Sequence, residues 1–116
     1  MSRSEASATA RHIATLHAKL HITPAQEALW RPLAAAMWNS VAALDHVYAE
    51  RGRHYDQMSA VDDLRSYGLV QQTNADNVKS LIAPFERLYA SFSPAQKRRA
   101  DMAVRQFTDS AVKASR

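Results

Sequence analysis

The chain has 116 residues and a formal charge of +4, and it contains no cysteine, two glycines and four prolines. A chain of this length forms one domain, and the absence of cysteine excludes disulfides and thiolate metal sites. Because turn-forming residues are scarce and alanine is abundant, the composition predicts an all-α fold. The positive charge favours acidic partners without choosing among unfolded proteins, nucleic acid and anionic lipid.

The first helix is expected over residues 5–20, where apolar side chains recur at helical spacing. Residues 1–4 are expected to form a disordered tail, so that residues 5–116 make one helical domain. The N-terminal residues lack the apolar segment of a secretory signal peptide, which we take to be absent from this sequence. A mature secreted protein whose leader has been removed would look the same. The longest uncharged run, residues 32–44, is too short to span a bilayer, so no membrane insertion is expected.

A helix-starting motif follows, with the sequence Ile-Thr-Pro-Ala-Gln at residues 22–26. We expect the Thr23 hydroxyl to accept from the N–H of Gln26, and the Gln26 side chain to reach back to the N–H of Thr23. Pro24 lies at the first helical position, where a missing N–H has no consequence and φ is already set. The second helix therefore begins at Pro24 and is expected to run to about Arg51.

The second helix has features that suggest a bend and a stop. Pro32 deprives the Ala28 carbonyl of its helical partner, so a bend is expected there. Gly52 is expected to end the helix. The apolar stripe of this helix is expected at Leu29, Leu33, Ala36, Met37, Val41, Leu44, Val47 and Tyr48, with Trp30, Ala34 and Trp38 beside it.

The third helix is predicted from about Ala60 to Ala90, with Ser59 as its cap. Its middle, residues 68–77, supplies little apolar surface and indicates a weakly packed section where the helix could be interrupted. Pro84 is expected to kink its far end. The side chains expected to keep the apolar period are Val61, Leu64, Ala75, Val78, Ile82, Phe85, Leu88 and Tyr89.

The helix-starting motif returns as Phe-Ser-Pro-Ala-Gln at residues 92–96, 70 residues after its first copy. Ser93, Pro94 and Gln96 occupy the places of the earlier cap, proline and glutamine, so this is an internal repeat. A fourth helix is expected over Pro94 to Ala114. The side chains of this helix expected to face inward are Ala100, Ala103, Val104, Phe107 and Ala111.

Two long helices joined by a short polar link must lie antiparallel, because each has an apolar face to bury. We therefore expect four helices, with the two long ones forming a bent hairpin and the two shorter ones flanking it. Helices this long in so small a chain leave apolar surface uncovered. A second copy of the chain or a binding partner is expected to cover it.

The two Pro-Ala-Gln caps, the first followed by Trp30, resemble the LTxxQ-motif family of Spy/CpxP-like periplasmic proteins. The family pattern is Leu-Thr-x-x-Gln; here Ile22 and Phe92 replace the leucine, and Ser93 replaces the threonine, which preserves the capping chemistry. The resemblance covers about residues 12–110. It implies a cradle-shaped antiparallel helical homodimer, a periplasmic location, and a role as an ATP-independent chaperone or envelope-stress protein that binds partly unfolded clients.

Candidate contacts for such clients can be named from the residue types. Trp30 and Trp38 lie two turns apart and could form an aromatic platform, and methionine repacks easily against variable partners. Packing in the core or in a dimer interface is the simpler interpretation of the same side chains. The candidate client-binding residues are Trp30, Met37, Trp38, Arg31 and Arg65.

Other chemistries have weaker support. His17 and His21 have the spacing of two metal ligands, but no carboxylate in that stretch completes a site for zinc, nickel or copper. Neither a phosphate-binding glycine loop nor a catalytic motif occurs, so we expect no enzymatic activity and no cofactor. The basic residues from Lys97 to Arg99, with Arg105, are expected to be a solvated face that binds no nucleic acid.

Three functions remain open from the sequence. The first is the chaperone or stress-associated role, in which a basic, partly apolar concave face holds unfolded clients. The second is a metal-responsive accessory or sensor protein that uses His17 and His21. The third is a passive helical module that binds one dedicated partner.

Overall fold

The structure is a computed structural model in which residues 1–114 are described. Its four α-helices are α1 (Arg3–Lys19), α2 (Glu27–His54), α3 (Ala60–Ala90) and α4 (Pro94–Ala114). Short 3-10 helices, Pro24–Gln26 and Tyr55–Gln57, precede and follow α2. No strand occurs in residues 1–114, so the predicted all-α fold is confirmed.

The helix boundaries agree closely with those expected for α3 and α4. The polar middle of α3 does not interrupt the helix, and Pro84 lies inside it. The predicted disordered tail is wrong at Arg3 and Ser4, which belong to α1. The reason is a cap that the prediction overlooked, because the Ser2 hydroxyl accepts from the N–H of Glu5 at 3.1 Å.

Gly52 does not end α2, which continues to His54. No glycine in the described chain has a positive φ, and a side chain at Gly52 would meet open space. Gly52 therefore acts as an ordinary helical residue. The chain leaves the helix only at Met58, whose ψ of 131° is extended, and Ser59 then caps α3 by accepting from the N–H of Asp62.

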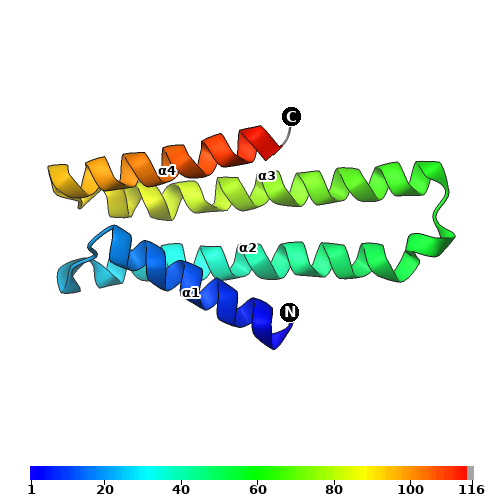
Figure 1. Cartoon of the computed structure of the whole chain (residues 1–116), viewed down its shortest axis with the longest axis horizontal. Coiled ribbons are helices and arrows are strands. Elements are labelled where there is room, and N and C mark those ends of the chain that lie inside the picture. Colours follow the sequence, from blue (N-terminus) through cyan, green and yellow to red (C-terminus); the bar gives the residue numbers. More distant parts are fainter. Residues whose placement is uncertain (115–116) are drawn as a thin grey trace.

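Helices α2 and α3 form a long antiparallel hairpin (Figure 1). Near its tip, Arg51 of α2 forms an ion pair with Asp63 of α3 at 2.6 Å. Halfway along, the Asn77 side chain donates to the Ser40 carbonyl at 3.0 Å. The molecule measures 53 × 31 × 21 Å, and its radius of gyration of 16.6 Å exceeds the roughly 13 Å typical of a compact domain of this length.

The face that α3 turns toward α2 differs from the expected one. The buried and half-buried positions of its inner face are Asp63, Ser66, Val70, Thr73, Asn77, Leu81, Pro84 and Leu88. Leu88 of the predicted apolar stripe belongs to this inner face, but most of the stripe lies about a quarter-turn away and is exposed, including Leu64 at 73% and Ile82 at 57%. The face that packs inward combines the buried Val70, Pro84 and Leu88 with polar contacts to α2 from Asp63 and Asn77.

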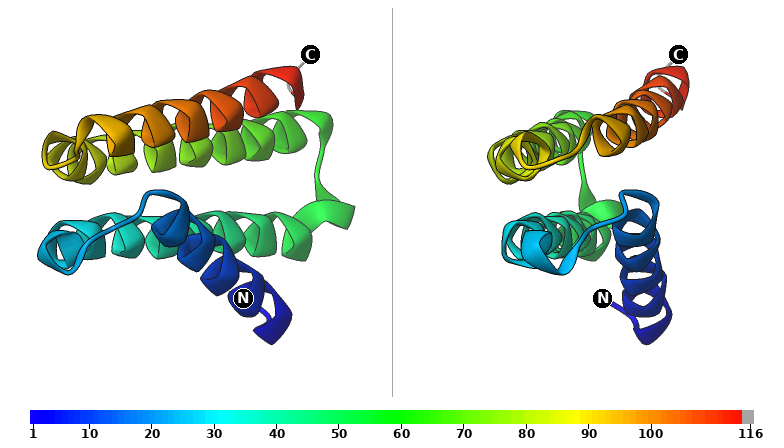
Figure 2. Two further views of the ribbon diagram at one scale, coloured as in Figure 1. Left: turned by 60° about the vertical axis from the view of Figure 1, so that its left-hand side comes forward. Right: turned by 90° about the vertical axis from the view of Figure 1, so that its left-hand side faces the viewer.

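Helix α4 is also less buried than expected. Ala100 is buried, whereas Val104 and Phe107 are exposed, Phe107 at 59%. Figure 2 shows why, because α1 and α4 diverge from each other on one side of the α2–α3 hairpin. The hydrophobic core therefore sits at the end of the molecule opposite the α2–α3 connection, where all four helices meet. Its buried members are Ile13, Leu20, Trp30, Leu33, Leu88, Phe92 and Ala100.

Candidate functional site

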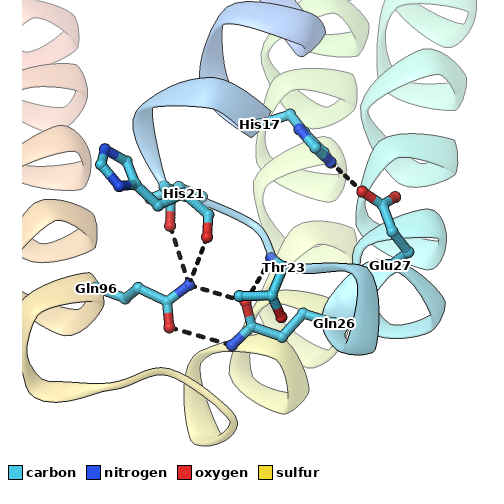
Figure 3. A network of polar contacts seen from close by, with 7 residues as sticks. His17, His21, Thr23, Gln26, Glu27 and Gln96 are labelled. Atoms are coloured by element: carbon cyan, nitrogen blue, oxygen red, sulfur yellow. Dashed lines mark hydrogen bonds and ion pairs between the residues drawn. The ribbon is translucent and has the colours of Figure 1, made fainter.

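We call the two helix-starting segments, residues 22–26 and 92–96, the corner motifs. Their glutamines meet in the interior, at the end of the molecule where the four helices come together (Figure 3). The Gln26 amide donates to the side-chain oxygen of Gln96 at 3.1 Å, and the Gln96 amide donates to that of Gln26 at 2.8 Å. Gln26 is 8% exposed and Gln96 is 6% exposed. Residues 70 positions apart in the chain are thus joined by a reciprocal pair of buried hydrogen bonds.

Each glutamine also completes the cap of its own helix. The side-chain oxygen of Gln26 accepts from the N–H of Thr23 at 3.1 Å, and that of Gln96 accepts from the N–H of Ser93 at 2.9 Å. The N–H of Gln96 in turn donates to the Ser93 hydroxyl at 3.2 Å, which closes a capping box. The capping-box geometry is present at Thr23 as well.

The side-chain amides of the two glutamines also donate to backbone carbonyls beside the other corner motif. Gln96 donates to the carbonyls of Leu20 and His21, at 3.2 and 3.0 Å, and Gln26 donates to the carbonyl of Ser91 at 3.1 Å. These carbonyls belong to the ends of α1 and α3, which lack helical partners of their own. Each motif therefore starts one helix and ties down the end of a helix from the other half of the chain.

His21 makes this arrangement possible through its backbone. It has a φ of 54°, the one positive value at a non-glycine residue in the described part of the chain. A left-handed residue just after a helix end is a common way to satisfy the last carbonyls, and histidine adopts it more readily than most residues. The turn presents the His21 carbonyl to Gln96. The metal-ligand spacing of His17 and His21 gave no indication of this backbone role.

Loss of the second cap has a defined expected cost. Ser93→Ala removes the acceptor for the N–H of Gln96 and should lower the free energy of unfolding by about 1 kcal/mol. Thr23→Ala should lower the free energy of unfolding by less, because the N–H of Gln26 also donates to the main-chain carbonyl of Thr23 at 2.9 Å. Urea unfolding followed by circular dichroism measures both values. Equal losses at the two positions would contradict this difference.

Trp30 lies in the core, in agreement with the interpretation that it packs inside the protein and does not form a client platform. It is 6% exposed, and the His17 ring packs edge-on against it with a centroid separation of 5.1 Å. Met37 and Trp38 are half-buried against the same core. Trp30 is therefore not on the surface where a client could reach it. Arg31 and Arg65 are exposed but belong to different helices and do not share a site with the tryptophans.

The two histidines with metal-ligand spacing serve other purposes. The Nε2 atom of His17 contacts a carboxylate oxygen of Glu27, which links α1 to the first turn of α2. His21 contributes its carbonyl to the glutamine network, and its ring points away from His17 (Figure 3). Across residues 1–114, no three His, Cys, Asp or Glu side chains converge to hold a metal ion.

A basic and apolar cleft opens between the end of α1 and one face of α4. Its volume is about 630 Å³. Lys19, Arg99 and Arg105 lie around it, and none of the three forms an ion pair with a described residue. Met102, 73% exposed, supplies the largest apolar side chain. The remaining residues that line this α1–α4 cleft are Ala103, Gln106 and Asp109.

Comparison with known families accounts for the corner motifs. The model of the LTXXQ motif family matches residues 8–103, which include both motifs and parts of all four helices. The chain belongs to the LTXXQ motif family. The match confirms the resemblance inferred from the caps. No curated protein and no solved structure matches the chain.

The glutamine of the LTXXQ motif thus has a visible role in this member of the family. Sequence reasoning found its capping contact but missed its contact with the second glutamine. The available signal was the duplication itself, because two equivalent motifs can make equivalent contacts with each other. Within residues 1–114, no helix has the length and hydropathy needed to cross a membrane.

Proposed function

We propose that this LTXXQ protein is an ATP-independent chaperone or envelope-stress protein of the bacterial periplasm, and that it holds partly unfolded clients in the α1–α4 cleft. The supporting observation is that three unpaired cations and an exposed methionine share one open cleft. Family membership supports the compartment and the stress-related role. Acidic and apolar segments of an unfolded chain have the chemistry that such a cleft recognises.

Charge and apolar surface act at different stages of client binding. Lys19, Arg99 and Arg105 attract acidic segments over a distance of about 10 Å at 0.1 M salt. Met102 then provides adaptable apolar contact, because its flexible thioether repacks against different side chains. The cleft is shallow and has no deep apolar pocket, so the bound segment stays weakly held.

Release needs no nucleotide in this mechanism. A client that folds buries its own apolar side chains, and this burial stabilises the folded client by about 25 cal/mol per Å² of apolar surface. Folding thereby removes the apolar surface that the cleft contacts. The affinity for the folded client falls as a result. A holding chaperone of this kind lowers aggregation without consuming energy.

The test compares the wild type with Arg99→Glu/Arg105→Glu in suppression of aggregation of a chemically denatured acidic protein. We expect suppression at 20 mM salt that weakens strongly by 500 mM, and about a tenfold higher requirement for the variant. Light scattering measures both. The matched control is Arg11→Glu/Arg87→Glu. It changes the net charge equally, and neither of these arginines lines the cleft.

The outcomes separate the cleft from charge in general. Wild-type behaviour of the control with loss in the cleft variant supports the proposal. Equal loss in both variants would assign the effect to net charge and contradict a role for the cleft. Absence of protection by the wild type at any ratio of protein to client would end the proposed function.

A further inference from the structure

Met102 presents its thioether to solvent in the α1–α4 cleft. It is 73% exposed, whereas Met37 and Met58 are half-buried. The fourth methionine, Met1, is 47% exposed and lies outside the cleft, where its ammonium group forms an ion pair with Asp45. Because the chain contains no cysteine, no thiol competes with methionine sulfur for a two-electron oxidant. The accessible sulfur of the cleft is therefore open to oxidation.

Two cations of the cleft lie one helical turn on either side of Met102. Arg99 precedes it by three residues and Arg105 follows it by three, and side chains at this spacing are neighbours on a helix surface. Lys19 reaches the same cleft from the end of α1, and Asp109 is the one carboxylate among the described residues that line it. An oxygen atom added to the sulfur of Met102 would thus lie among N–H donors.

We propose that Met102 is a reversible oxidation site, and that its conversion to the sulfoxide weakens the binding of acidic and apolar segments in the α1–α4 cleft. The oxidant is a two-electron oxygen donor, of which hydrogen peroxide is the simplest. The sulfur lone pair attacks one peroxide oxygen, the O–O bond breaks, and hydroxide leaves. The proton on the transferred oxygen passes to the hydroxide, which gives the sulfoxide and water. Sulfur loses two electrons and the peroxide gains them.

Oxidation changes the cleft in two ways. A flexible apolar thioether becomes a polar, chiral sulfoxide, so the cleft loses its largest apolar side chain. The sulfoxide oxygen is also an acceptor for the guanidinium groups of Arg99 and Arg105, which carry several N–H donors each. Guanidinium groups that bond this oxygen are less available to the carboxylates of a client. Both changes weaken binding.

The fold should survive this modification. Among the described residues, Met102 belongs neither to the buried core nor to the side chains packed against it. Met37, in contrast, packs against the core, where a sulfoxide would disturb the packing. Oxidation at Met102 therefore alters the binding surface and leaves the helices in place. Enzymes that reduce methionine sulfoxide can restore the thioether.

The first experiment measures the oxidation itself. The full chain is treated with dilute hydrogen peroxide, and each methionine is followed by mass spectrometry of its peptide. Met102 should be oxidised about tenfold faster than Met37 and Met58, because exposure controls access to the sulfur. Circular dichroism of the protein oxidised at Met102 should show unchanged helical content. Equal rates at the three methionines, or loss of helix with oxidation of Met102, would overturn the proposal.

The second experiment measures the cleft without any client. The probe is anilinonaphthalene sulfonate, which combines an anionic group with apolar rings and is followed by its fluorescence. The signal from the cleft is the part that Arg99→Glu/Arg105→Glu removes. For this part, oxidation of the wild type should raise the dissociation constant roughly three- to tenfold, and methionine sulfoxide reductases of both stereospecificities should reverse the change.

Met102→Leu is the matched control, since leucine keeps a similar apolar volume and cannot be oxidised. Compared with its own untreated sample, the dissociation constant of this variant should change by less than about 1.5-fold after peroxide treatment. A reversible change in the wild type that is absent from Met102→Leu supports the proposal. An unchanged probe affinity in the oxidised wild type, or an equal change in both proteins, would overturn it.

The effect on clients rests on the proposed function and is measured last. Oxidation should raise the amount of wild-type protein needed to suppress client aggregation by about threefold, and should leave that of Met102→Leu at its untreated value. If the untreated wild type gave no protection, the proposed function would fail, and the oxidation rates and probe affinities would still decide the role of Met102. Full protection by the oxidised wild type would overturn the role of Met102 and leave the proposed function intact.

Discussion

Replacing Gln96 with alanine should lower the free energy of unfolding by about 3–5 kcal/mol, which is a large fraction of the stability of a domain this small. The side chain serves the N–H of Ser93, the carbonyls of Leu20 and His21, and both polar atoms of Gln26. Its removal leaves several of these groups buried without partners. Urea unfolding of the purified protein measures the loss.

The matched control is Gln72→Ala on the exposed face of α3. Gln72 donates only to Asp76, one helical turn away, at 2.9 Å. Alanine is also a better helix former, so the expected change is within about 0.5 kcal/mol. If Gln96→Ala proved as mild as this control, the buried network would contribute little, and the helix caps alone would account for the motif.

The second large effect concerns the two faces of α3. Leu88→Ala should destabilise the protein by about 2.5–5 kcal/mol, because Leu88 is completely buried in the core where the four helices meet. Leu69→Ala makes the same chemical change on the same helix, but Leu69 is 55% exposed. Its expected loss is below about 1 kcal/mol.

Thermal and urea unfolding at one protein concentration compare the two leucine variants. The concentration must be held constant because self-association adds to apparent stability. Comparable losses in the two variants would mean that α3 is rotated from the orientation described above.

Much of the fold follows from local chemistry in the sequence. Ser59, Ser93 and the two Pro-Ala-Gln segments specify where α2, α3 and α4 begin, and these features operate within one helical turn. The end of α2 was harder to predict, because glycine permits a helix to stop without requiring it. There the extended backbone at Met58 decides the boundary, and no residue type demands it.

The packing of α3 could not be read from periodicity. The helix has two stripes, one that mixes polar residues with Val70, Leu81 and Leu88 and one that is more continuously apolar, and both repeat at nearly the helical period. The rule that apolar faces pack inward selected the wrong stripe. Asn77 and Asp63 of the mixed stripe hydrogen-bond across to α2, and these pairings depend on a register that sequence alone does not give.

The candidate site was only partly predictable for a related reason. The cations at Arg99 and Arg105 were noticed as one basic run, but Lys19 lies 80 residues from Arg99 in the sequence. The three come together because the glutamine pair places the end of α1 against the start of α4. Trp30, the most conspicuous aromatic residue in the sequence, is held in the core by the same corner.

The central claim is that the two LTXXQ glutamines act as one unit, and a double-mutant cycle tests it most directly. Unfolding free energies are measured for the wild type, Gln26→Ala, Gln96→Ala and the double variant. The account predicts a loss in the double variant that falls short of the summed single losses by about 1–3 kcal/mol, because either single change already breaks the pair. Strict additivity, with a coupling energy within about 0.3 kcal/mol of zero, would contradict it.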